Sequence, residues 1–392
     1  MPRHPLVAAT SRGLSDRIYS SLAERARRRQ GPVYPLHVGD TWLAPPEAVR
    51  EEARIAADRP GTWNYSPVQG EPVLLEAIRA RLESRCGVVV DPECLQVMPG
   101  ATAGLAIVAA ALLEPGDEVL LPSPFWPLIR GILRGRGAVP VEIPLFTRLS
   151  EPGFDVEAAL EERVTSRTAA VYVNSPHNPT GRVLSDAAVA AIARVARRHD
   201  LWVIADEAYE DLAYGAQPRP IWRRPDLAER TVAMHTLSKS HALAGARVGY
   251  AHGPRDVMAA VRGVQAHDNY CASHPMQLAA ARALAEGEAW LQGVRRAYSD
   301  AGRAAAVVAG VPSPDAGTFL FLDAAPFFRA GEGLEGFLER CLEAGLLLTP
   351  GPACGRDFTT WVRMCFTAVP PDDLARALDR LGGVLRGPAR PA

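Results

Sequence analysis

The stretch Thr236-Leu237-Ser238-Lys239-Ser240, followed by Gly245 and Arg247, contains the only lysine of the 392-residue chain. The sequence has 43 basic residues, so the other 42 are arginines. A guanidinium stays protonated, whereas an ε-amine can lose its proton when it is desolvated and then attack a carbonyl. A solvated surface charge is the ordinary alternative, because lysine is mostly exposed in proteins. The neighbouring hydroxyls and arginine favour a functional amine, and we predict that Lys239 forms a Schiff base.

Length and composition indicate a cytoplasmic globular protein of two domains. The chain is longer than one hydrophobic core usually covers, and its apolar content of 48% and charged content of 22% are ordinary. A net charge of -1 gives no reason to expect nucleic acid or a membrane surface as a partner. The six cysteines are scattered without a CxxC pair, which argues against a metal site. The longest apolar run, around Ala103–Leu113, is too short to cross a bilayer.

Apolar runs of strand length recur along the middle of the chain, and segments rich in Ala and Leu separate most of them. Continuous runs of this kind are typical of a largely parallel sheet that helices cover on both faces. We therefore expect an α/β fold with a mainly parallel seven-stranded sheet. The expected strands are Leu95–Met98, Glu118–Leu121, Val139–Ile143, Ala169–Val173, Leu201–Ala205, Thr231–Thr236 and Val248–Ala251.

Both ends of the chain are expected to lie outside this sheet. Residues 1 to about 30 predict an amphipathic helix, with Ile18, Leu22 and Ala26 on one side and arginines on the other. The apolar run Phe319–Leu322 belongs to a smaller C-terminal α+β unit. We predict an N-terminal segment over 1–45 that contributes to the small domain, a large cofactor-binding domain over 46–285 and a C-terminal small domain over 286–392.

An aldehyde cofactor with an anionic tail needs phosphate ligands, a partner for a ring nitrogen and a surface to stack on. Gly100-Ala101-Thr102 follow an expected strand and open an expected helix, so free backbone N–H groups would meet an anion there. Glycine-rich turns also serve packing alone. Thr236, Ser238 and Arg247 add hydroxyls and a cation near Lys239. Together the two loops predict an anion site.

Five further residues supply chemistry at or near expected strands. Asp206 ends an apolar strand and could keep a pyridine nitrogen protonated, although an Asp there could also cap a helix. Tyr209 and Asn178 are candidate donors to a phenolic oxygen, with packing and turn formation as alternatives. Trp126 offers a ring for stacking. Arg363 is flanked by apolar residues, which indicates a buried fork for a carboxylate or a structural ion pair.

Over nearly its whole length the chain resembles the class I/II aminotransferases, which are fold-type I pyridoxal 5'-phosphate enzymes. The resemblance implies an enzyme that moves an amino group from an L-amino acid to a 2-oxo acid by a ping-pong mechanism. The motifs that carry it are Ser238-Lys239 with Gly245-Ala246-Arg247, Asn178-Pro179-Thr180-Gly181 and Asp206-Glu207-Ala208-Tyr209.

The resemblance also implies a role for each residue of the cofactor site. Lys239 would carry the cofactor and then act as general acid and base. Asp206 would hold the pyridinium, while Tyr209 and Asn178 would hold the phenolic oxygen. Trp126 would stack on the ring. The phosphate would be held by Ala101, Thr102, Thr236, Ser238 and Arg247.

Further correspondences imply a homodimer with shared active sites and place the substrate. Tyr65 is similar to the family's tyrosine that reaches a phosphate in the neighbouring subunit. Gly39 matches a turn beside the substrate carboxylate, which Arg363 would bind. Trp42 and Asn178 are our further candidates for contact with the substrate.

The chain departs from the family pattern at two places. The turn after Gly39 is usually rich in Pro and Phe, and here it is Thr41-Trp42-Leu43. The arginine that binds a second carboxylate in dicarboxylate-preferring members is replaced near Asn269-Tyr270. A bulky Trp42 at the pocket mouth would suit an amino donor with a neutral, aliphatic or aromatic side chain.

Three other classes of protein stay open on the sequence. Carbon–sulfur β-lyases and decarboxylases use the same scaffold and cofactor residues, so the cofactor motifs do not separate them from an aminotransferase. A transcription regulator on this fold would need a helix-turn-helix domain, and the roughly thirty residues before Val33 are too few for one. A non-catalytic binding protein is disfavoured by the intact set of Lys239, Asp206 and Asn178.

Overall fold

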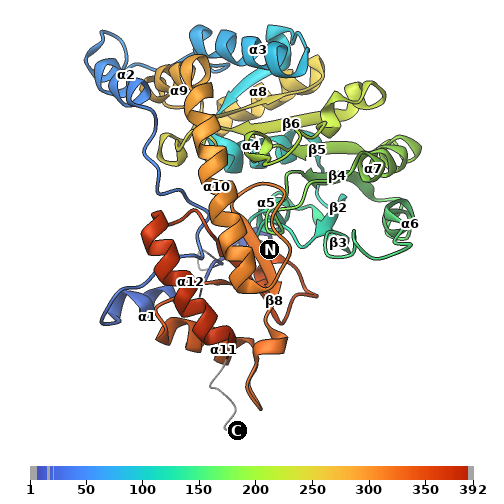
Figure 1. Cartoon of the computed structure of the whole chain (residues 1–392). Helices are drawn as coiled ribbons and strands as arrows, with labels where there is room; N and C mark the ends of the chain where they lie inside the picture. The colour runs from blue at the N-terminus through green and yellow to red at the C-terminus, as the bar shows by residue number, and fades with distance from the viewer. Residues whose placement is uncertain (1–6, 16–17, 21, 387–392) are drawn as a thin grey trace.

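A computed structural model describes residues 7–15, 18–20 and 22–386, and Figure 1 shows a large unit above a smaller one. The large unit is built on a seven-stranded sheet in which β7 is antiparallel to both neighbours and the other pairs are parallel. The predicted mainly parallel sheet is confirmed. Its strands, side by side, are β1 (Leu95–Met98), β7 (Gly249–His252), β6 (Thr231–Thr236), β5 (Trp202–Asp206), β4 (Thr168–Asn174), β2 (Glu118–Ser123) and β3 (Val139–Pro144).

Helices cover both faces of this sheet, as its continuous apolar strands require. In β4, for example, Ala170 and Tyr172 pack into the core on one face, while Val171 and Val173 pack into the core on the other. The first core takes α4 (Gly100–Leu112), α5 (Ile129–Gly135) and α8 (Arg255–Asp268). The second takes α2 (Glu47–Asp58), α3 (Pro72–Cys86), α6 (Val156–Glu161), α7 (Asp186–Arg198) and α9 (His274–Glu286).

The smaller unit contains residues from both ends of the chain. Its antiparallel sheet has the order β8 (Phe319–Asp323), β10 (Trp361–Cys365) and β9 (Thr349–Pro350). The N-terminal segment joins it through backbone hydrogen bonds, from Tyr34 N to Gly345 O (2.8 Å) and from Cys365 N to Leu36 O (2.8 Å). The helices of this part are α10 (Glu288–Ala309), which runs from the large unit into the small one in Figure 1, α11 (Leu334–Glu343) and α12 (Pro371–Arg386).

The predicted N-terminal helix is wrong for the described residues. This segment contains only a 3-10 turn at Ala9–Ser11 and the short helix α1 (Ala23–Arg28). Gly13 has a φ of +77°, a conformation that ends a right-handed helix. Residues 1–6, 16, 17 and 21 of the predicted helix lie outside the described residues. Ala26 of α1 packs on the small unit.

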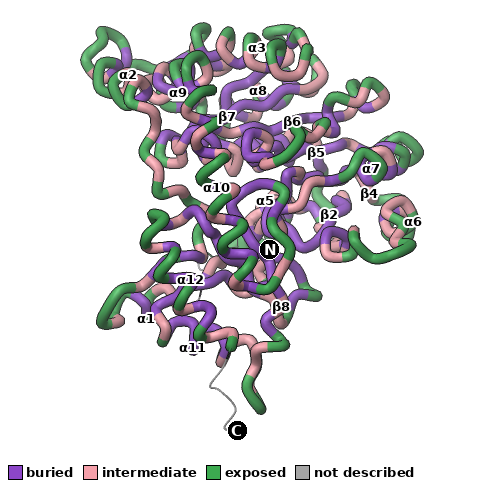
Figure 2. Tube along the Cα trace, in the orientation of Figure 1, coloured by how far each residue is buried: buried purple, intermediate pink, exposed green. Residues whose placement is uncertain are grey.

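Burial follows this architecture, with buried strands inside and exposed residues on the outer faces of the helices (Figure 2). The large unit ends with α9 at Glu286 and α10 begins at Glu288, while the domain boundaries at residues 45 and 285 stay a prediction. Among the described residues, no helix combines the length and the apolar character that crossing a membrane demands.

Candidate active site

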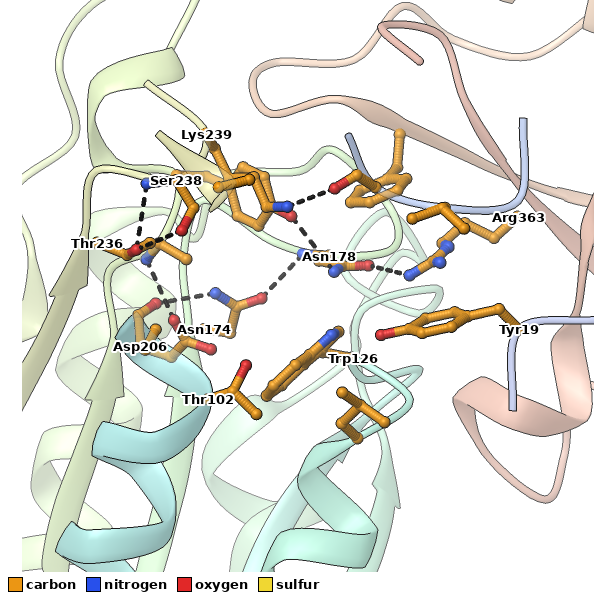
Figure 3. A pocket seen from close by; sticks show the side chains of 18 of the residues that line it. Tyr19, Thr102, Trp126, Asn174, Asn178, Asp206, Thr236, Ser238, Lys239 and Arg363 are labelled. Carbon is orange, nitrogen blue, oxygen red and sulfur yellow. Dashed lines mark hydrogen bonds between the residues drawn. The ribbon is translucent and has the colours of Figure 1, made fainter. Parts of the chain in front are cut away.

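A cavity lies where the carboxyl ends of β4, β5 and β6 face the small unit, and Figure 3 shows it from close by. Such strand ends are where open α/β sheets bind ligands. The structure brings most of the predicted site residues together here. Those that line the cavity are Gly39, Ala101, Thr102, Trp126, Asn178, Asp206, Tyr209, Thr236, Ser238, Lys239, Arg247 and Arg363.

Lys239 follows β6 and reaches across to the N-terminal segment. Its Nζ donates a hydrogen bond to the carbonyl oxygen of Gly39. Burial lowers the pKa of the Lys239 amine, an effect that Cys365 and Asp40 partly oppose. Residue 39 has no room for a side chain, because a Cβ there would lie 2.4 Å from the ring of Phe319. The only lysine is therefore a partly buried amine between the two units, and its pKa is lower than that of a surface lysine.

One end of the cavity collects groups suited to an anion. Helix α4 begins there, and its first residues Ala101 and Thr102 line the cavity. Its N-cap residue makes no side-chain hydrogen bond, so the first N–H groups of the helix are available to an anion. Gly100 has a φ of +80°, and a Cβ on it would lie 2.4 Å from Nη2 of Arg247. Thr236 Oγ1 lies 2.9 Å from Ser238 Oγ. Backbone amides, two hydroxyls and a guanidinium thus converge near Lys239.

Asp206 is the last residue of β5 and is held on several sides. Its Oδ2 accepts a hydrogen bond from the hydroxyl of Tyr172 (2.5 Å) and its Oδ1 accepts one from the backbone N–H of Ala208 (3.1 Å). Asn174 Nδ2 donates to the backbone oxygen of Asp206 (2.8 Å). Burial raises the pKa of the Asp206 carboxyl, although the Tyr172 and Ala208 hydrogen bonds act in the opposite direction. The hydrogen bond from Ala208 lies within the turn that follows β5. Asp206 does not cap a helix, since the next helical turn begins only at Glu210.

Asn178 connects Tyr209 to Arg363. Its Nδ2 lies 3.5 Å from the hydroxyl of Tyr209, and its Oδ1 accepts a hydrogen bond from Arg363 Nη1 (3.0 Å). Burial raises the pKa of Tyr209 far above its ordinary value, so its hydroxyl stays neutral. Two donors therefore face the middle of the cavity.

Arg363, on β10, forms the far end of the cavity and is 1% exposed. Its Nη2 donates to the backbone oxygen of His37 (2.9 Å), while its Nε has no hydrogen-bond partner in the described part of the chain. The guanidinium lies over the rings of Tyr19 (5.3 Å to the centroid) and Phe319 (4.3 Å). A buried cation with an unused donor and no carboxylate partner fits an anionic ligand better than a structural ion pair.

Several lining residues were missed from the sequence. Asn174 ends an apolar strand with a polar side chain, as Asp206 does, and that signal could have identified it. Tyr19 and Phe319 come from segments without a motif, and only the tertiary structure places them beside Arg363. The other missed lining residues are Val38, Leu128, Ala208 and Ala244.

Two predicted residues lie outside the cavity of the single chain. Trp42 is 39% exposed, and its backbone N–H donates to Thr367 O (3.0 Å). Tyr65 is 82% exposed and meets the ring of Tyr270 edge to face, with centroids 5.0 Å apart. An exposed aromatic pair of this kind suits an interface. The predicted roles of Trp42 and Tyr65 stay predictions.

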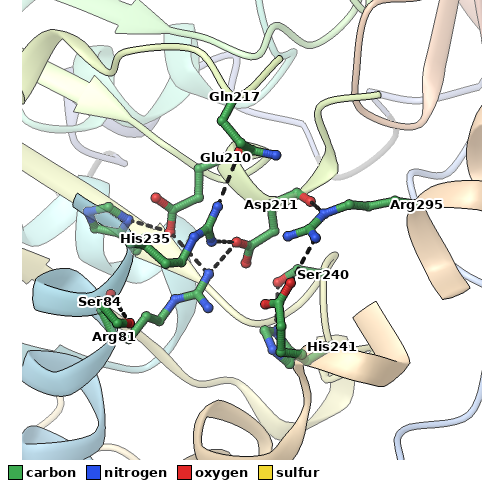
Figure 4. A network of polar contacts seen from close by, with 11 residues as sticks. Arg81, Ser84, Glu210, Asp211, Gln217, His235, Ser240, His241 and Arg295 are labelled. Atoms are coloured by element: carbon green, nitrogen blue, oxygen red, sulfur yellow. Dashed lines mark hydrogen bonds and ion pairs between the residues drawn. The ribbon is translucent and has the colours of Figure 1, made fainter. Parts of the chain in front are cut away.

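A buried polar network behind the cavity fixes the segments that carry these groups (Figure 4). Arg81 and Arg85 of α3 both pair with Asp211, which lies two residues after Tyr209. His235, just before Thr236 on β6, bonds to Glu210 through Nδ1 (2.9 Å). Burial alone would raise the pKa of Glu210, but His235 and the arginines hold it well below its usual range. The network thus anchors the backbone on both sides of the cofactor residues.

The donor set fits pyridoxal 5'-phosphate along the whole cavity. The amide and guanidinium end suits its phosphate, and Asp206 suits a ring nitrogen that must stay protonated. Tyr209 and Asn178 suit its phenolic oxygen, and the amine of Lys239 suits its aldehyde.

Comparison with known proteins gives the same result. The chain matches the family described as aminotransferase class I and II over residues 32–381. It is 33% identical to a probable aspartate/prephenate aminotransferase of Thermus aquaticus, over 96% of this chain and 100% of that protein. It is also 33% identical to an arginine–pyruvate transaminase of Pseudomonas aeruginosa, over 86% of this chain and 87% of that protein.

Solved structures agree with these relatives. The aspartate aminotransferase of Thermus thermophilus with maleate superposes with a TM-score of 0.88 at 29% identity, covering 97% of this chain and 100% of that one. The chain therefore belongs to the class I and II aminotransferase family and is a pyridoxal 5'-phosphate-dependent amino acid aminotransferase.

Proposed function

We propose that this aminotransferase moves the amino group of an L-amino acid with a neutral or aromatic side chain to a 2-oxo acid, by a ping-pong mechanism. The observation that carries the proposal is the presence of a partly buried amine and a buried guanidinium in one cavity. Lys239 supplies the amine, and Arg363 presents an unused Nε to a carboxylate. A substrate held by its α-carboxylate at Arg363 would place its α-carbon near Lys239.

The chemistry divides between the cofactor and the chain. Pyridoxal phosphate, when bound, supplies an electron-withdrawing ring that stabilises the negative charge left on the substrate's α-carbon. Lys239 Nζ takes the proton from that carbon and later returns one, and burial lowers the pKa of this amine in the direction that such a base needs. Asp206 would hold the ring nitrogen and, as a carboxylate, favour its protonated form. Arg363 orients the substrate, and Phe319 and Tyr19 exclude water from the guanidinium.

The lining of the substrate end supports the side-chain preference. The cavity wall carries Tyr19, Val38, Leu128 and Phe319, and the rings of Tyr19 and Phe319 lie against the Arg363 guanidinium. The other arginine that lines the cavity is beside Gly100, at the anion end. Among the described lining residues, no second cation therefore faces a side-chain carboxylate, and apolar walls favour apolar side chains.

We also propose a cytoplasmic homodimer with shared sites. Tyr65 and Trp63 are 82% and 79% exposed, which is unusual for aromatic side chains and suits burial against a second copy. In such a dimer the hydroxyl of Tyr65 would reach the phosphate bound in the partner's cavity. The near-zero net charge is compatible with self-association.

The test is a half-reaction on the cofactor-loaded enzyme with one amino acid at a time and no oxo acid. We expect phenylalanine, tyrosine and leucine to change the cofactor absorbance and to release one oxo acid per site, faster than aspartate does. Aspartate as the fastest donor would refute the side-chain preference. Release of pyruvate and ammonia from a cysteine conjugate, with an unchanged spectrum, would refute transamination. The Lys239→Arg variant, which lacks the amine, is the inactive control.

A further inference from the structure

Tyr172 is a polar residue inside the sheet that has a single polar contact. It lies on β4 and is 2% exposed, among the apolar side chains of the core formed with α4, α5 and α8. Its hydroxyl donates to Asp206 Oδ2 at 2.5 Å (Figure 3 shows Asp206 at the cavity wall). No other hydrogen bond of this hydroxyl is found within residues 22–386. A hydroxyl in such a place is costly unless it is paired, so Asp206 explains its presence.

The ionisation of Asp206 is a balance between burial and hydrogen bonds. A buried carboxylate beside a protonated ring nitrogen is an ion pair, and a low-dielectric site favours moving the proton to give a neutral pair instead. Each hydrogen bond donated to the carboxylate makes it less basic and opposes that transfer. Here the donors are the Tyr172 hydroxyl and the Ala208 N–H, and the imidazole of His235 on β6 also favours the charged form.

The two donors differ in what they depend on. The N–H of Ala208 belongs to the turn that follows β5 and is set by the backbone. The hydroxyl of Tyr172 comes from the neighbouring strand and is set by one side chain. Burial raises the pKa of Tyr172 well above its ordinary value, so its hydroxyl keeps its proton and can donate the hydrogen bond throughout the working pH range.

We propose that Tyr172 is a positioning residue that keeps Asp206 a carboxylate, so that the proton shared with the cofactor's ring nitrogen stays on the ring. This inference rests on the proposed role of Asp206 as the partner of that nitrogen. Both oxygens of Asp206 accept a hydrogen bond from the chain. Tyr172 Oη donates to Oδ2, and the Ala208 N–H donates to Oδ1. Without Tyr172 the carboxylate is more basic and draws the proton away from the ring.

The experiment uses enzyme loaded with pyridoxal phosphate that carries ¹⁵N in the ring, because the ¹⁵N chemical shift reports whether that nitrogen is protonated. Three variants are compared with the unsubstituted enzyme: Tyr172→Phe, Asp206→Asn and Tyr250→Phe. Tyr250 is the matched control. It is likewise buried in the sheet, on β7, and its hydroxyl has no hydrogen-bond partner among the described residues.

We expect a protonated ring nitrogen in the unsubstituted enzyme and in Tyr250→Phe. In Tyr172→Phe the ratio of protonated to unprotonated nitrogen should fall by on the order of tenfold, the effect of losing one hydrogen bond to a charged group. The transamination rate should fall in parallel. Tyr172→Met, which also lacks the hydroxyl, gives a second test if the phenylalanine variant does not fold.

The outcomes separate this inference from the proposed function. A ¹⁵N shift in Tyr172→Phe equal to that of Tyr250→Phe, while Asp206→Asn loses the protonated state, would overturn the role of Tyr172 and leave Asp206 in place. A ring nitrogen that is equally protonated in Asp206→Asn would overturn the role of Asp206 itself.

Discussion

Two regions of the molecule differ in how the chain builds them. The cavity floor consists of the residues at the ends of β4, β5 and β6 and the first turn of α4, and several of these residues are hydrogen-bonded to one another. The second region, called the rim here, lies outside the cavity and consists of Trp42, Tyr65 and Tyr270, which are 39%, 82% and 45% exposed. The floor residues come together within one chain, whereas the rim presents exposed aromatic surface. Chemistry should therefore depend on the floor, and substrate choice and assembly on the rim.

The largest expected effect is on the floor, at Lys239. Lys239→Arg keeps a cation but cannot form the bond to the aldehyde or move the α-proton, so we expect turnover to fall by about 10⁴-fold or more. The steady-state rate of transamination with the best donor measures this fall in turnover. Arg303→Lys, at an exposed ion pair with Asp300, is the matched control and should keep full activity. Substantial turnover by Lys239→Arg would show that the floor does not carry the chemistry.

Arg363 belongs to the small unit and lines the same cavity as the floor, and its loss should be nearly as damaging. Arg363→Lys gives up the planar fork and leaves Asn178 Oδ1 and the His37 oxygen without a donor. We expect kcat/KM to fall by about 10²- to 10³-fold, the range for truncating a buried charged contact. The fall should be seen with donor and acceptor alike, since each has a carboxylate. A loss confined to one of the two would contradict a shared carboxylate site.

The floor should also reveal itself through the pH dependence of stability without cofactor. Burial raises the pKa of Asp206 above its value in the unfolded chain. Its contribution is therefore favourable at low pH and is lost as the pH rises through the folded pKa. We expect Asp206→Asn to raise the thermal midpoint of the cofactor-free protein by a few degrees at pH 8 and by nothing near pH 4.

Thermal scans across this pH range measure the midpoint of unfolding for the parent and for Asp206→Asn. Asp300→Asn, at an exposed position, is the control. With cofactor bound the order should reverse, because the unsubstituted carboxylate then has a cationic partner. A variant that is less stable than the parent at pH 8 without cofactor would contradict the sign of this effect.

On the rim, Tyr65 should matter for the cofactor more than for the fold. If its hydroxyl reaches the phosphate in a second copy, Tyr65→Phe should weaken cofactor binding by about tenfold, as expected for a hydrogen bond to a charged group. Equilibrium dialysis measures the dissociation constant, and light scattering measures the oligomeric state. Trp63→Phe is the control. Unchanged cofactor affinity in a proven dimer would remove Tyr65 from the shared site.

The smallest effect is expected at Trp42. Its ring is 39% exposed and outside the cavity, and its backbone bond to Thr367 does not depend on the side chain. We expect Trp42→Ala to lower kcat/KM for an aromatic donor about fivefold, the loss of part of an apolar contact, and to leave aspartate unaffected. An equal loss for both donors would point to a structural effect instead.

The sheet was predictable because its strands are buried on both faces. Each appears as a continuous apolar run, and the predicted bounds agree with the structure to within two residues at every end. The N-terminal helix was not predictable, since the apolar spacing of Ile18, Leu22 and Ala26 says nothing of the turn at Gly13 or of what the segment packs against. Tertiary contacts decide such short amphipathic pieces.

The floor of the site was also predictable, because polar side chains at strand ends and a helix start are local features. Tyr172 could not be found this way. Within Val171-Tyr172-Val173 it has the pattern of one more core aromatic, and its partner is known only once β4 is placed beside β5. Tyr19 carries no motif at all and acquires its place from the fold.

If the single lysine carries the cofactor, reduction of the loaded enzyme should trap the cofactor on that residue. Borohydride applied to the loaded enzyme, followed by peptide mass spectrometry, should attach the cofactor mass to Lys239 at one per chain. The double variant Lys239→Arg/Arg303→Lys has the same composition but a displaced amine, and it should trap none. Cofactor attached to the N-terminal amine, or to the displaced lysine, would show that Lys239 is not the residue that carries it.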